Sequence, residues 1–541
     1  MRAFLSLLPL FLLAACAAAP PPPAAPPPPA PVPAAPPPAP PAAPTAAQVP
    51  PPPDACAAYA QAPLGCDTGR PLPERLADAL GENESLTRDR RLACIEPEAK
   101  ELSVVIRALR ADLAPLACAD AIVTPFLELA GKTLSPDDEG TLLGLMLAGK
   151  LSRLVSAPPE LQAPFDKQRF LDFFEQTLKP WMVAQALAIG QLSIEGSKLH
   201  GYGKAVAAVE AGLADLRFVQ AVRKVPLPTE LGGDPDVKNV YYSALDEALE
   251  PRKVRGRDAA LVGLRLMAEL GTLADPRVTR ARRLLSELYG GSRVDALDRL
   301  IVPELSPLQL DNADQKLAAR LPTYYALRLL SNLKNPGEPK LLRAFGERGL
   351  PASLRTFLDS APLGPEAKLS YANLELRRGV LYFAAPAFAR AAELARSVPG
   401  DATAEFVLAL ARALEGSPKD AAALMLSSPR LQGPLGTLEP LLALAKKKGR
   451  FAAEAEFDAA YLASLTPPDN DAKFWTDLSQ RFARAEKGLR APAQKSLAKD
   501  LAESARKTAE AIRNAPPAPP SPAQTPAPAA PPPTPASPSA P

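Results

Sequence analysis

Residues 135–154 have the sequence SPDDEGTLLGLMLAGKLSRL. Ser135 followed by Pro136 indicates a helix start, because a capping hydroxyl satisfies one free amide and a proline in the first turn removes another. Three acidic residues follow and favour the positive end of a helix dipole. Behind them the leucines recur every three or four positions, which is the spacing of a helix with one apolar face. This stretch therefore predicts an α-helix.

The same helix start recurs along the chain. A capping residue precedes a proline at four further places, which are Asp234-Pro235, Asp275-Pro276, Ser306-Pro307 and Ser417-Pro418. Glycine or proline ends most apolar runs after about ten to twenty residues, the usual length of a globular helix. The alternating β-branched runs that strands require are hard to find. We therefore predict an all-α fold, a solenoid of stacked helical hairpins flanked by disordered Pro/Ala-rich tails.

The N-terminal residues have the pattern of an export signal. One positive charge, Arg2, precedes an apolar run from Ala3 to Leu13 that is too short to span a bilayer. The run ends in Leu13-Ala14-Ala15-Cys16, which resembles the bacterial lipobox. The resemblance implies that residues 1–15 are a signal peptide and that Cys16 carries the lipid. An ordinary secretory signal cut in the alanine-rich stretch is the alternative.

The lipobox resemblance also implies a location. Residue 17 is alanine, not aspartate, which in the best-known lipoprotein sorting rule implies release to the outer membrane. Two or three acyl chains give stable anchoring where a single chain is marginal. We expect a body that lies in the periplasm and is held to the membrane only through this anchor.

Proline-rich stretches flank the body of the chain. Residues 20–53 contain 20 prolines in 34 positions and no charge, so they cannot bury a core. We interpret 16–53 as the lipid anchor and a semi-rigid linker, which at about 3.1 Å per residue reaches up to roughly 100 Å. Residues 516–541 contain 13 prolines in 26 positions, also without charge. A disordered tail is therefore predicted for 515–541.

The remaining residues are divided into four predicted parts. A cysteine-containing helical cap is expected at 54–135, helical repeats at 136–362, a second repeat region at 363–467 and C-terminal helices at 468–514. The 62 basic and 59 acidic residues of the chain nearly balance. This balance does not favour a nucleic-acid partner.

Small and aromatic residues recur between 366 and 465. The first set is Ala372, Gly379, Ala384, Phe388 and Ala391, followed by Ala409, Gly416, Ala421 and Met425, and then by Gly449, Phe451, Ala453, Phe457 and Ala460. This spacing resembles the tetratricopeptide (TPR) repeat, in which small residues let two helices cross closely and a large residue fills the gap to the next pair. The period departs from the family, being 37 and then 33 residues. The early Trp-Leu-Gly-Tyr cluster is missing.

Four cysteines, Cys56, Cys66, Cys94 and Cys118, lie within the first 65 residues of the body. An exported protein meets an oxidising compartment, so we predict two disulfides. Three pairings are available, and the short loop from 56 to 66 and the helix-sized span from 94 to 118 favour local bridges. The alternative, a metal site, is weaker because there is no Cys-x-x-Cys pair and no histidine nearby.

The residues that most catalytic sites need are scarce. His200 is the single histidine and lies in a predicted turn, where we expect it exposed. Residues 144–150 have the spacing of a phosphate loop, but Leu151 stands where serine or threonine would hold magnesium. Ser496 and Lys499 match the first element of penicillin-binding acylases, yet the other two elements are absent. We expect a protein that is not an enzyme and has no metal, cofactor or small-molecule substrate.

The repeat resemblance places a partner-binding surface. If Gly379 and Gly449 mark equivalent turns, the first helix of each unit should line a concave side. Four side chains would then meet the partner, namely Asn373, Arg377, Lys446 and Lys447. Basic and amide groups favour an extended peptide with acidic groups or a free carboxylate. The alternative is a basic run that only contacts solvent.

Two functions remain in view. Stacked hairpins on a tethered linker favour a scaffold or assembly factor for a protein complex of the cell envelope, with another envelope protein as partner. The alternative is a regulator or binder of the peptidoglycan synthesis machinery. An enzyme would need a deep pocket with converging polar groups, which the sequence does not locate.

Overall fold

The computed structural model describes residues 45–61, 65–130, 134–289, 294–305, 308–330, 333, 335–382, 384–415, 438–468 and 470–515. Over these ranges the secondary structure is helical, with no strand and one isolated bridge between Thr272 and Gly349. The all-α prediction is confirmed. Cys16, the signal peptide, residues 16–44 of the linker and residues 516–541 of the tail lie outside the described ranges. None of the described helices is both long and apolar enough to span a bilayer.

The cysteine-containing region is a group of short helices. These are α1 (Ala57–Ala60), α2 (Leu72–Leu80), α3 (Ser85–Ile95), α4 (Ser103–Leu113) and α5 (Ala119–Ala130), with 3-10 turns at Asp54–Cys56, Lys100–Leu102 and Leu116–Cys118. Two disulfides join them, Cys56 to Cys118 and Cys66 to Cys94, with Cα separations of 5.1 and 5.4 Å.

The local cysteine pairing is therefore wrong, although all four cysteines are in disulfides as predicted. Loop-closure entropy grows slowly with loop length, so nearness along the chain selects a partner only weakly. Helix packing decides instead: α1 packs against α5, and Cys94 lies in the last turn of α3. Pairings across 62 and 28 residues result.

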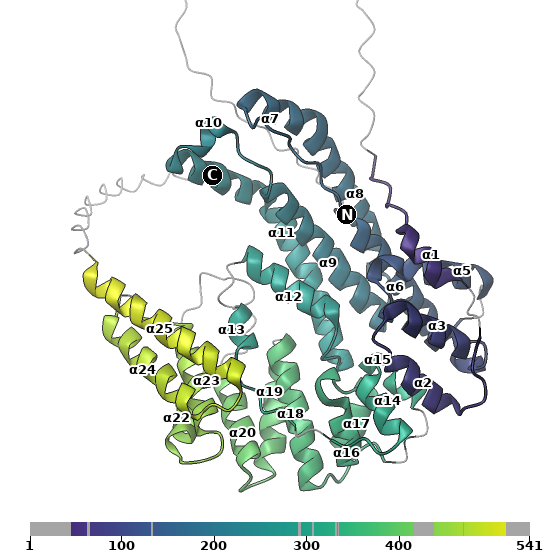
Figure 1. The fold of residues 1–541 in the computed structure, drawn as a ribbon, viewed down its shortest axis with the longest axis vertical. Coiled ribbons are helices and arrows are strands. Elements are labelled where there is room, and N and C mark those ends of the chain that lie inside the picture. The colour runs from purple at the N-terminus through teal and green to yellow at the C-terminus, as the bar shows by residue number, and fades with distance from the viewer. Residues whose placement is uncertain are drawn as a thin grey trace, which may run out of the picture. The chain divides into compact units, whose positions relative to one another are not determined.

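The middle of the chain packs around one buried helix, α9 (Gly201–Arg223). Its most extensive contacts are with four helices (Figure 1): α6 (Pro136–Arg153), α8 (Lys179–Ser197), α11 (Pro235–Leu270) and α12 (Pro276–Leu288). Two glycines allow close approach. A Cβ at Gly203 would lie 1.9 Å from the carbonyl oxygen of Gly140, and one at Gly212 would lie 2.5 Å from the nitrogen of Ala260. The backbones of α9, α6 and α11 therefore touch.

Shorter elements connect and flank these helices. They are α7 (Lys167–Phe173), a π-helical turn (Phe174–Leu178), α10 (Thr229–Gly232), α13 (Val294–Asp298), α14 (Ala313–Arg320), α15 (Thr323–Leu329), α16 (Pro339–Phe345), a 3-10 turn (Gly346–Arg348) and α17 (Ala352–Ser360). The π turn joins α7 to α8 just before Pro180. Proline lacks an amide hydrogen and clashes with the carbonyl one turn earlier, which a wider turn relieves.

This part of the chain is not a simple series of hairpins. Helix α2 packs against α14, and the Arg320 guanidinium donates a hydrogen bond of 2.6 Å to the carbonyl oxygen of Ala77. The hydroxyls of Thr141 and Tyr324 also hydrogen-bond at 2.8 Å. A solenoid unit contacts only its neighbours in sequence. The expectation of serial stacking is therefore wrong for residues 54–362.

The C-terminal helices pack mainly against their neighbours in sequence (Figure 1). They are α18 (Pro365–Tyr382), α19 (Ala385–Arg396), α20 (Ala402–Glu415), α22 (Glu439–Lys446), α23 (Ala452–Ser464), α24 (Ala472–Gly488) and α25 (Pro492–Asn514). Gly379 packs against Phe388, since a Cβ there would lie 2.5 Å from the Phe388 ring. The small-residue crossing expected between α18 and α19 is present, although this alone does not identify a TPR repeat.

The repeat register, however, is wrong. Gly379 lies inside α18, whereas Gly449 lies between α22 and α23, so the two glycines are not equivalent turns. Residues 416–437 lie outside the described ranges, and with them Gly416, Ala421 and Met425 of the second expected unit.

Candidate functional site

The four predicted partner-binding residues do not form one surface. Asn373 is fully buried, and its amide donates to the carbonyl oxygen of Pro303. Arg377 donates to the Asn373 side-chain oxygen at 3.1 Å and pairs with Glu347 at 2.9 Å. Asn373 therefore supports Arg377 and the chain near Pro303, and it is unavailable to a partner. The helical register could not reveal this, because the burying segment lies 70 residues away.

The two lysines lie elsewhere, at the end of α22. Lys446 and Lys447 are exposed, and the Lys447 ammonium lies 3.3 Å from a Glu405 oxygen. Among the described residues no hydrogen bond or ion pair connects them with Asn373 or Arg377. A single groove formed by all four residues is thus not what the structure presents.

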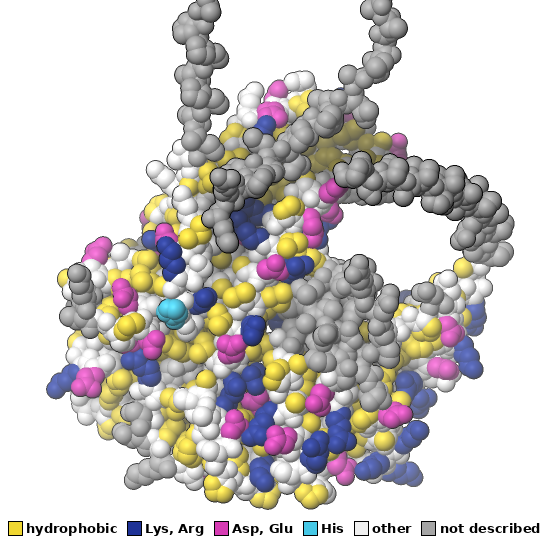
Figure 2. Space-filling view, turned by 180° about the vertical axis from the view of Figure 1, so that it is seen from behind, with side chains coloured by type: hydrophobic (Ala, Val, Ile, Leu, Met, Phe, Trp, Pro, Cys, Tyr) yellow, Lys and Arg dark blue, Asp and Glu magenta, His cyan; other side chains and the backbone are white. Residues whose placement is uncertain are grey.

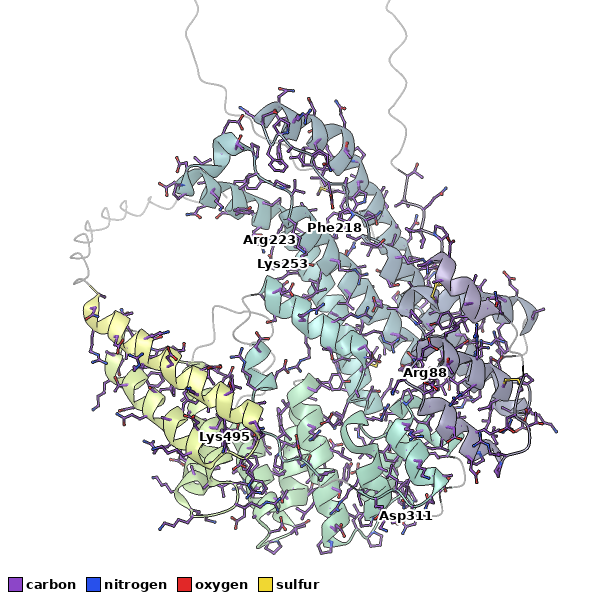
Figure 3. The ribbon with its side chains drawn as sticks, in the orientation of Figure 1. Arg88, Phe218, Arg223, Lys253, Asp311 and Lys495 are labelled. Atoms are coloured by element: carbon purple, nitrogen blue, oxygen red, sulfur yellow. A yellow bond between two sulfur atoms is a disulfide. The ribbon has the colours of Figure 1, made fainter. Side chains whose placement is uncertain are left out.

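A different site is formed by segments far apart in the sequence. A cleft of about 700 Å³ opens where α3, the end of α4, the start of α9, the loop before α12, α14, α15 and the turn after α16 meet. Its walls include the apolar side chains of Leu113, Pro276, Pro322 and Phe345. Figure 3 labels Arg88, which borders the cleft from α3.

Two paired loops form one wall of this cleft. The Leu273 amide donates to the Arg348 carbonyl at 2.8 Å, and the Leu350 amide donates to the Gly271 carbonyl at 3.0 Å. Gly271 and Gly349 have φ values of +80° and +99°, and a Cβ at Gly349 would lie 1.8 Å from the Gly271 oxygen. Only glycine fits both positions. This pairing places Thr272 and Arg348 beside the cleft.

A buried ionic network also borders the cleft. The Arg277 guanidinium donates to Asp112 at 2.6 Å, to Asp275 at 2.7 Å and to the Tyr202 hydroxyl at 2.9 Å. The Tyr202 hydroxyl donates to Asp112 at 2.5 Å. Burial raises the pKa of Tyr202 well above its ordinary value, so the phenol remains a neutral donor. Arg277 therefore has two carboxylate partners and has no charge left for a ligand.

Three tyrosines stiffen the cleft. The rings of Tyr202 and Tyr324 stack with centroids 4.2 Å apart, and Tyr325 meets both edge-on at 5.9 and 5.1 Å. Such pairs favour one fixed arrangement. The hydroxyl of Tyr324 is held by Thr141. The ring that borders the cleft is thus immobilised by residues of α6 and α9.

Other polar groups at the cleft lack a charged partner. Half-buried Arg348 has no hydrogen-bond or ion-pair partner for its guanidinium among the described residues, and burial lowers its pKa. Arg88 donates to the carbonyl oxygens of Leu113 at 2.8 Å and Glu82 at 3.2 Å, but to no carboxylate of a described residue. The Thr272 hydroxyl is fully buried, with 4% of the residue exposed, and has no partner in the part of the chain that the structure describes. The two arginines can receive an acceptor with negative charge.

The sequence offered little to identify this cleft. Asp275-Pro276 correctly marks the start of α12, where the Asp275 side chain accepts the Arg277 amide. No pattern links Asp112 with Arg277, which lie 165 residues apart. Positive φ at Gly271 and Gly349 also follows from loop pairing and not from neighbouring residues. Local motifs therefore do not reveal the site.

The motifs rejected from the sequence lie in ordinary helical contexts. His200 is exposed at the residue before α9, and Figure 2 shows the histidine at the molecular surface. Residues 144–150 lie within α6, as expected, and Ser496 and Lys499 are exposed on α25. Within the described ranges no group of histidine, cysteine, aspartate or glutamate is arranged to hold a metal ion.

Comparisons with protein-family models, with curated proteins and with solved structures find no match to this chain. On the face seen in Figure 2, basic and acidic side chains are interspersed, which fits the nearly balanced charge of the whole chain.

Proposed function

We propose that this protein is an envelope lipoprotein that is tethered through Cys16 to the outer membrane and acts as a helical scaffold or assembly factor by binding another envelope protein. The lipobox resemblance of Leu13-Ala14-Ala15-Cys16 supports the tether. Two cysteine pairs at disulfide distance support an oxidising compartment. The all-helical body supplies surfaces for a protein partner, and one of these surfaces is the main support for the proposal.

The main support for a protein-binding surface is the exposed face of α8. This helix has no charged residue between Lys179 and Glu195, and its apolar residues occupy all sides. A helix that is apolar all round is ordinarily buried on all sides. Yet Val183, Leu187 and Ile194 are 39, 37 and 61% exposed. Their spacing of four and seven residues places them on one face, opposite buried Ile189 and Leu192.

The proposed tether joins the body at this helix. The Ala47 amide donates to the Ala184 carbonyl at 2.9 Å, and the Arg153 guanidinium donates to the Pro50 carbonyl at 2.7 Å. Residues 45–53, assigned from the sequence to the linker, therefore pack on the body and start its folded part. The apolar face of α8 lies on the helix that receives this segment, so the tether would fix where the face is presented.

A second apolar surface adjoins α7. The first half of α11 exposes Val237 and Val240, by 38 and 71%. Its Tyr241 meets Phe170 of α7 edge-on, with ring centroids 6.5 Å apart. Exposed apolar surface of this extent on an exported protein favours a protein partner whose own apolar side chains cover it.

Site-specific photo-crosslinking in cells tests the proposal. A photoreactive residue at Leu187 or Ile194 should capture one defined envelope protein, whereas a residue at exposed Lys495 on α25 (Figure 3) should not. Leu187→Lys with Ile194→Lys should abolish capture from a third position, Val183. Gln191→Lys, which adds the same charge at an exposed polar position of α8, should preserve it.

The outcomes separate the hypotheses. Capture of a subunit of an envelope assembly supports a scaffold, and capture of a wall synthase supports a regulator of peptidoglycan synthesis. Capture of a second copy of this chain, or equal capture from Lys495, contradicts the proposed surface. Cys16→Ala tests the tether separately, because the variant should leave the membrane fraction. Retention of this unlipidated variant in membranes would overturn the tether.

A further inference from the structure

We propose that the cleft between the paired loops 271–273 and 348–350 and the helices α3, α4 and α15 binds a small organic anion through Arg348 and Arg88. The ligand chemistry is an oxyanion, a carboxylate or a phosphate, attached to an apolar portion. This site is independent of the apolar face on α8, and the scaffold function does not require it.

The charges around the cleft favour an anionic ligand. Arg277 is neutralised by Asp112 and Asp275, and the acid at the rim, Glu347, pairs with Arg377 outside the cleft. Within the described ranges Arg348 and Arg88 have no carboxylate partner. An anion that enters the cleft therefore meets two arginines whose charge is not already compensated by a salt bridge. Arginine binds carboxylate and phosphate with two parallel hydrogen bonds.

The paired loops hold Arg348 at the cleft. The Leu273 amide donates to the Arg348 carbonyl at 2.8 Å, and Gly271 and Gly349 allow the two backbones to touch. The backbone of Arg348 is therefore fixed by contacts that its guanidinium does not make. An anion in the cleft would supply that guanidinium with a partner.

The walls and the size define the rest of the ligand. A volume of about 700 Å³ is much larger than a free inorganic ion needs and lies in the range of sites for small organic molecules. Leu113, Pro322, Phe345 and the ring of Tyr324 supply apolar surface. The stack of Tyr324 on Tyr202 holds that ring in place. An anion with an apolar portion therefore fits better than a bare ion.

The test uses the full chain with its disulfides intact. Thermal unfolding and titration calorimetry are run with three probes: an N-acetylated dipeptide with a free carboxylate, the same dipeptide as its amide, and inorganic phosphate. The acid or phosphate, at millimolar concentration, should raise the melting temperature of the wild type by roughly 2–4 °C. The amide should not. Stabilisation by the acid assigns a carboxylate ligand, and stabilisation by phosphate assigns a phosphate ligand.

Two variants separate binding from folding. Arg348→Met removes a guanidinium that has no partner among the described residues, so the empty variant should melt at the wild-type temperature or higher while losing stabilisation by the anion. Thr272→Val keeps the side-chain shape and removes a fully buried hydroxyl that the anion does not contact, so it should leave anion binding unchanged. The matched control is Arg265→Met, which removes an exposed arginine of α11 outside the cleft and should behave as wild type.

Two outcomes would overturn the inference. The first is no stabilisation of the wild type by either oxyanion. The second is stabilisation that persists unchanged in Arg348→Met, because binding would then occur elsewhere. A fall in the melting temperature of the empty Arg348→Met protein would also count against the site, because it would show that Arg348 stabilises the fold itself.

Discussion

Residues 54–362 and residues 365–514 are both helical, yet different contacts hold them together. In the first region the decisive contacts span long stretches of chain, such as Asp112 with Arg277 and Arg320 with Ala77, which are 165 and 243 residues apart. In the second, helices pack mainly against the next helix in sequence. Contacts between distant residues require closure of long loops before they stabilise anything. The first region should therefore unfold as a unit, whereas a change in the second should destabilise only the helices near it.

The largest effect is expected from Arg277→Met, which breaks the network of the first region. Asp112 and Asp275 would remain buried without their partner, which costs about 5 kcal/mol of unfolding free energy. Urea unfolding measures the loss, and hydrogen exchange should show that residues 54–362 lose protection while α19–α25 keep theirs. Equal loss of protection in both regions would remove the distinction between them. Arg265→Met, at an exposed pair, should change the stability by no more than about 0.5 kcal/mol.

The disulfides of the first region give the next effect. Replacing both Cys56 and Cys118 with alanine removes a cross-link over 62 residues and should lower stability by about 4 kcal/mol. The corresponding change at Cys66 and Cys94, over 28 residues, should cost slightly less. Peptide mapping without reductant should recover 56 linked to 118 and 66 linked to 94. A disulfide between Cys56 and Cys66 would contradict the structure and support the local pairing expected from the sequence.

Gly379→Ala probes the second region. The added methyl group would lie 2.5 Å from the Phe388 ring, so α18 and α19 must separate at a cost of about 1–3 kcal/mol. Phe388→Leu should recover part of this loss in the double variant. Gly449→Ala is the matched control, because nothing lies within 4 Å of its added carbon. A loss of protection throughout residues 54–362 would show that the second region does not respond locally.

The smallest effect concerns a buried carboxyl of α23. Asp458 accepts the Ile301 amide at 2.9 Å, its other oxygen has no partner among the described residues, and burial raises its pKa well above the ordinary value. A raised folded-state pKa means that its contribution to stability is present below the unfolded pKa of about 3.9 and is lost as pH rises toward the folded value. Asp458→Asn should therefore match the wild type near pH 3 and exceed its stability by about 1 kcal/mol at pH 7.

Urea unfolding of both proteins between pH 3 and pH 7 measures the difference in unfolding free energy. The control Asp500→Asn, at an exposed position, should show no such pH-dependent difference. If Asp458→Asn were less stable than the wild type at pH 7, the ionised carboxylate would stabilise the fold. The expected gain in stability would then be wrong.

Helix starts were available from the sequence because the physics that makes them is local. The side chains of Ser135, Asp234 and Asp275 each accept an amide of the first helical turn, as their position before proline predicted. Ser306-Pro307 and Ser417-Pro418 lie outside the described residues. The apolar repeat of three and four is likewise set within one helix. The helical class and several helix starts therefore followed from residues close together in the chain.

The tertiary structure alone decided which of these helices meet. It paired Cys56 with Cys118, buried Asn373 beneath Pro303, and brought Arg348 and Thr272 to one cleft through the contact of Gly271 with Gly349. A helical pattern records that a residue faces inward or outward, but it does not record the segment that later covers it. The energy of burial depends on that distant segment. The sequence by itself thus determined the helices, and packing between remote segments determined the candidate site.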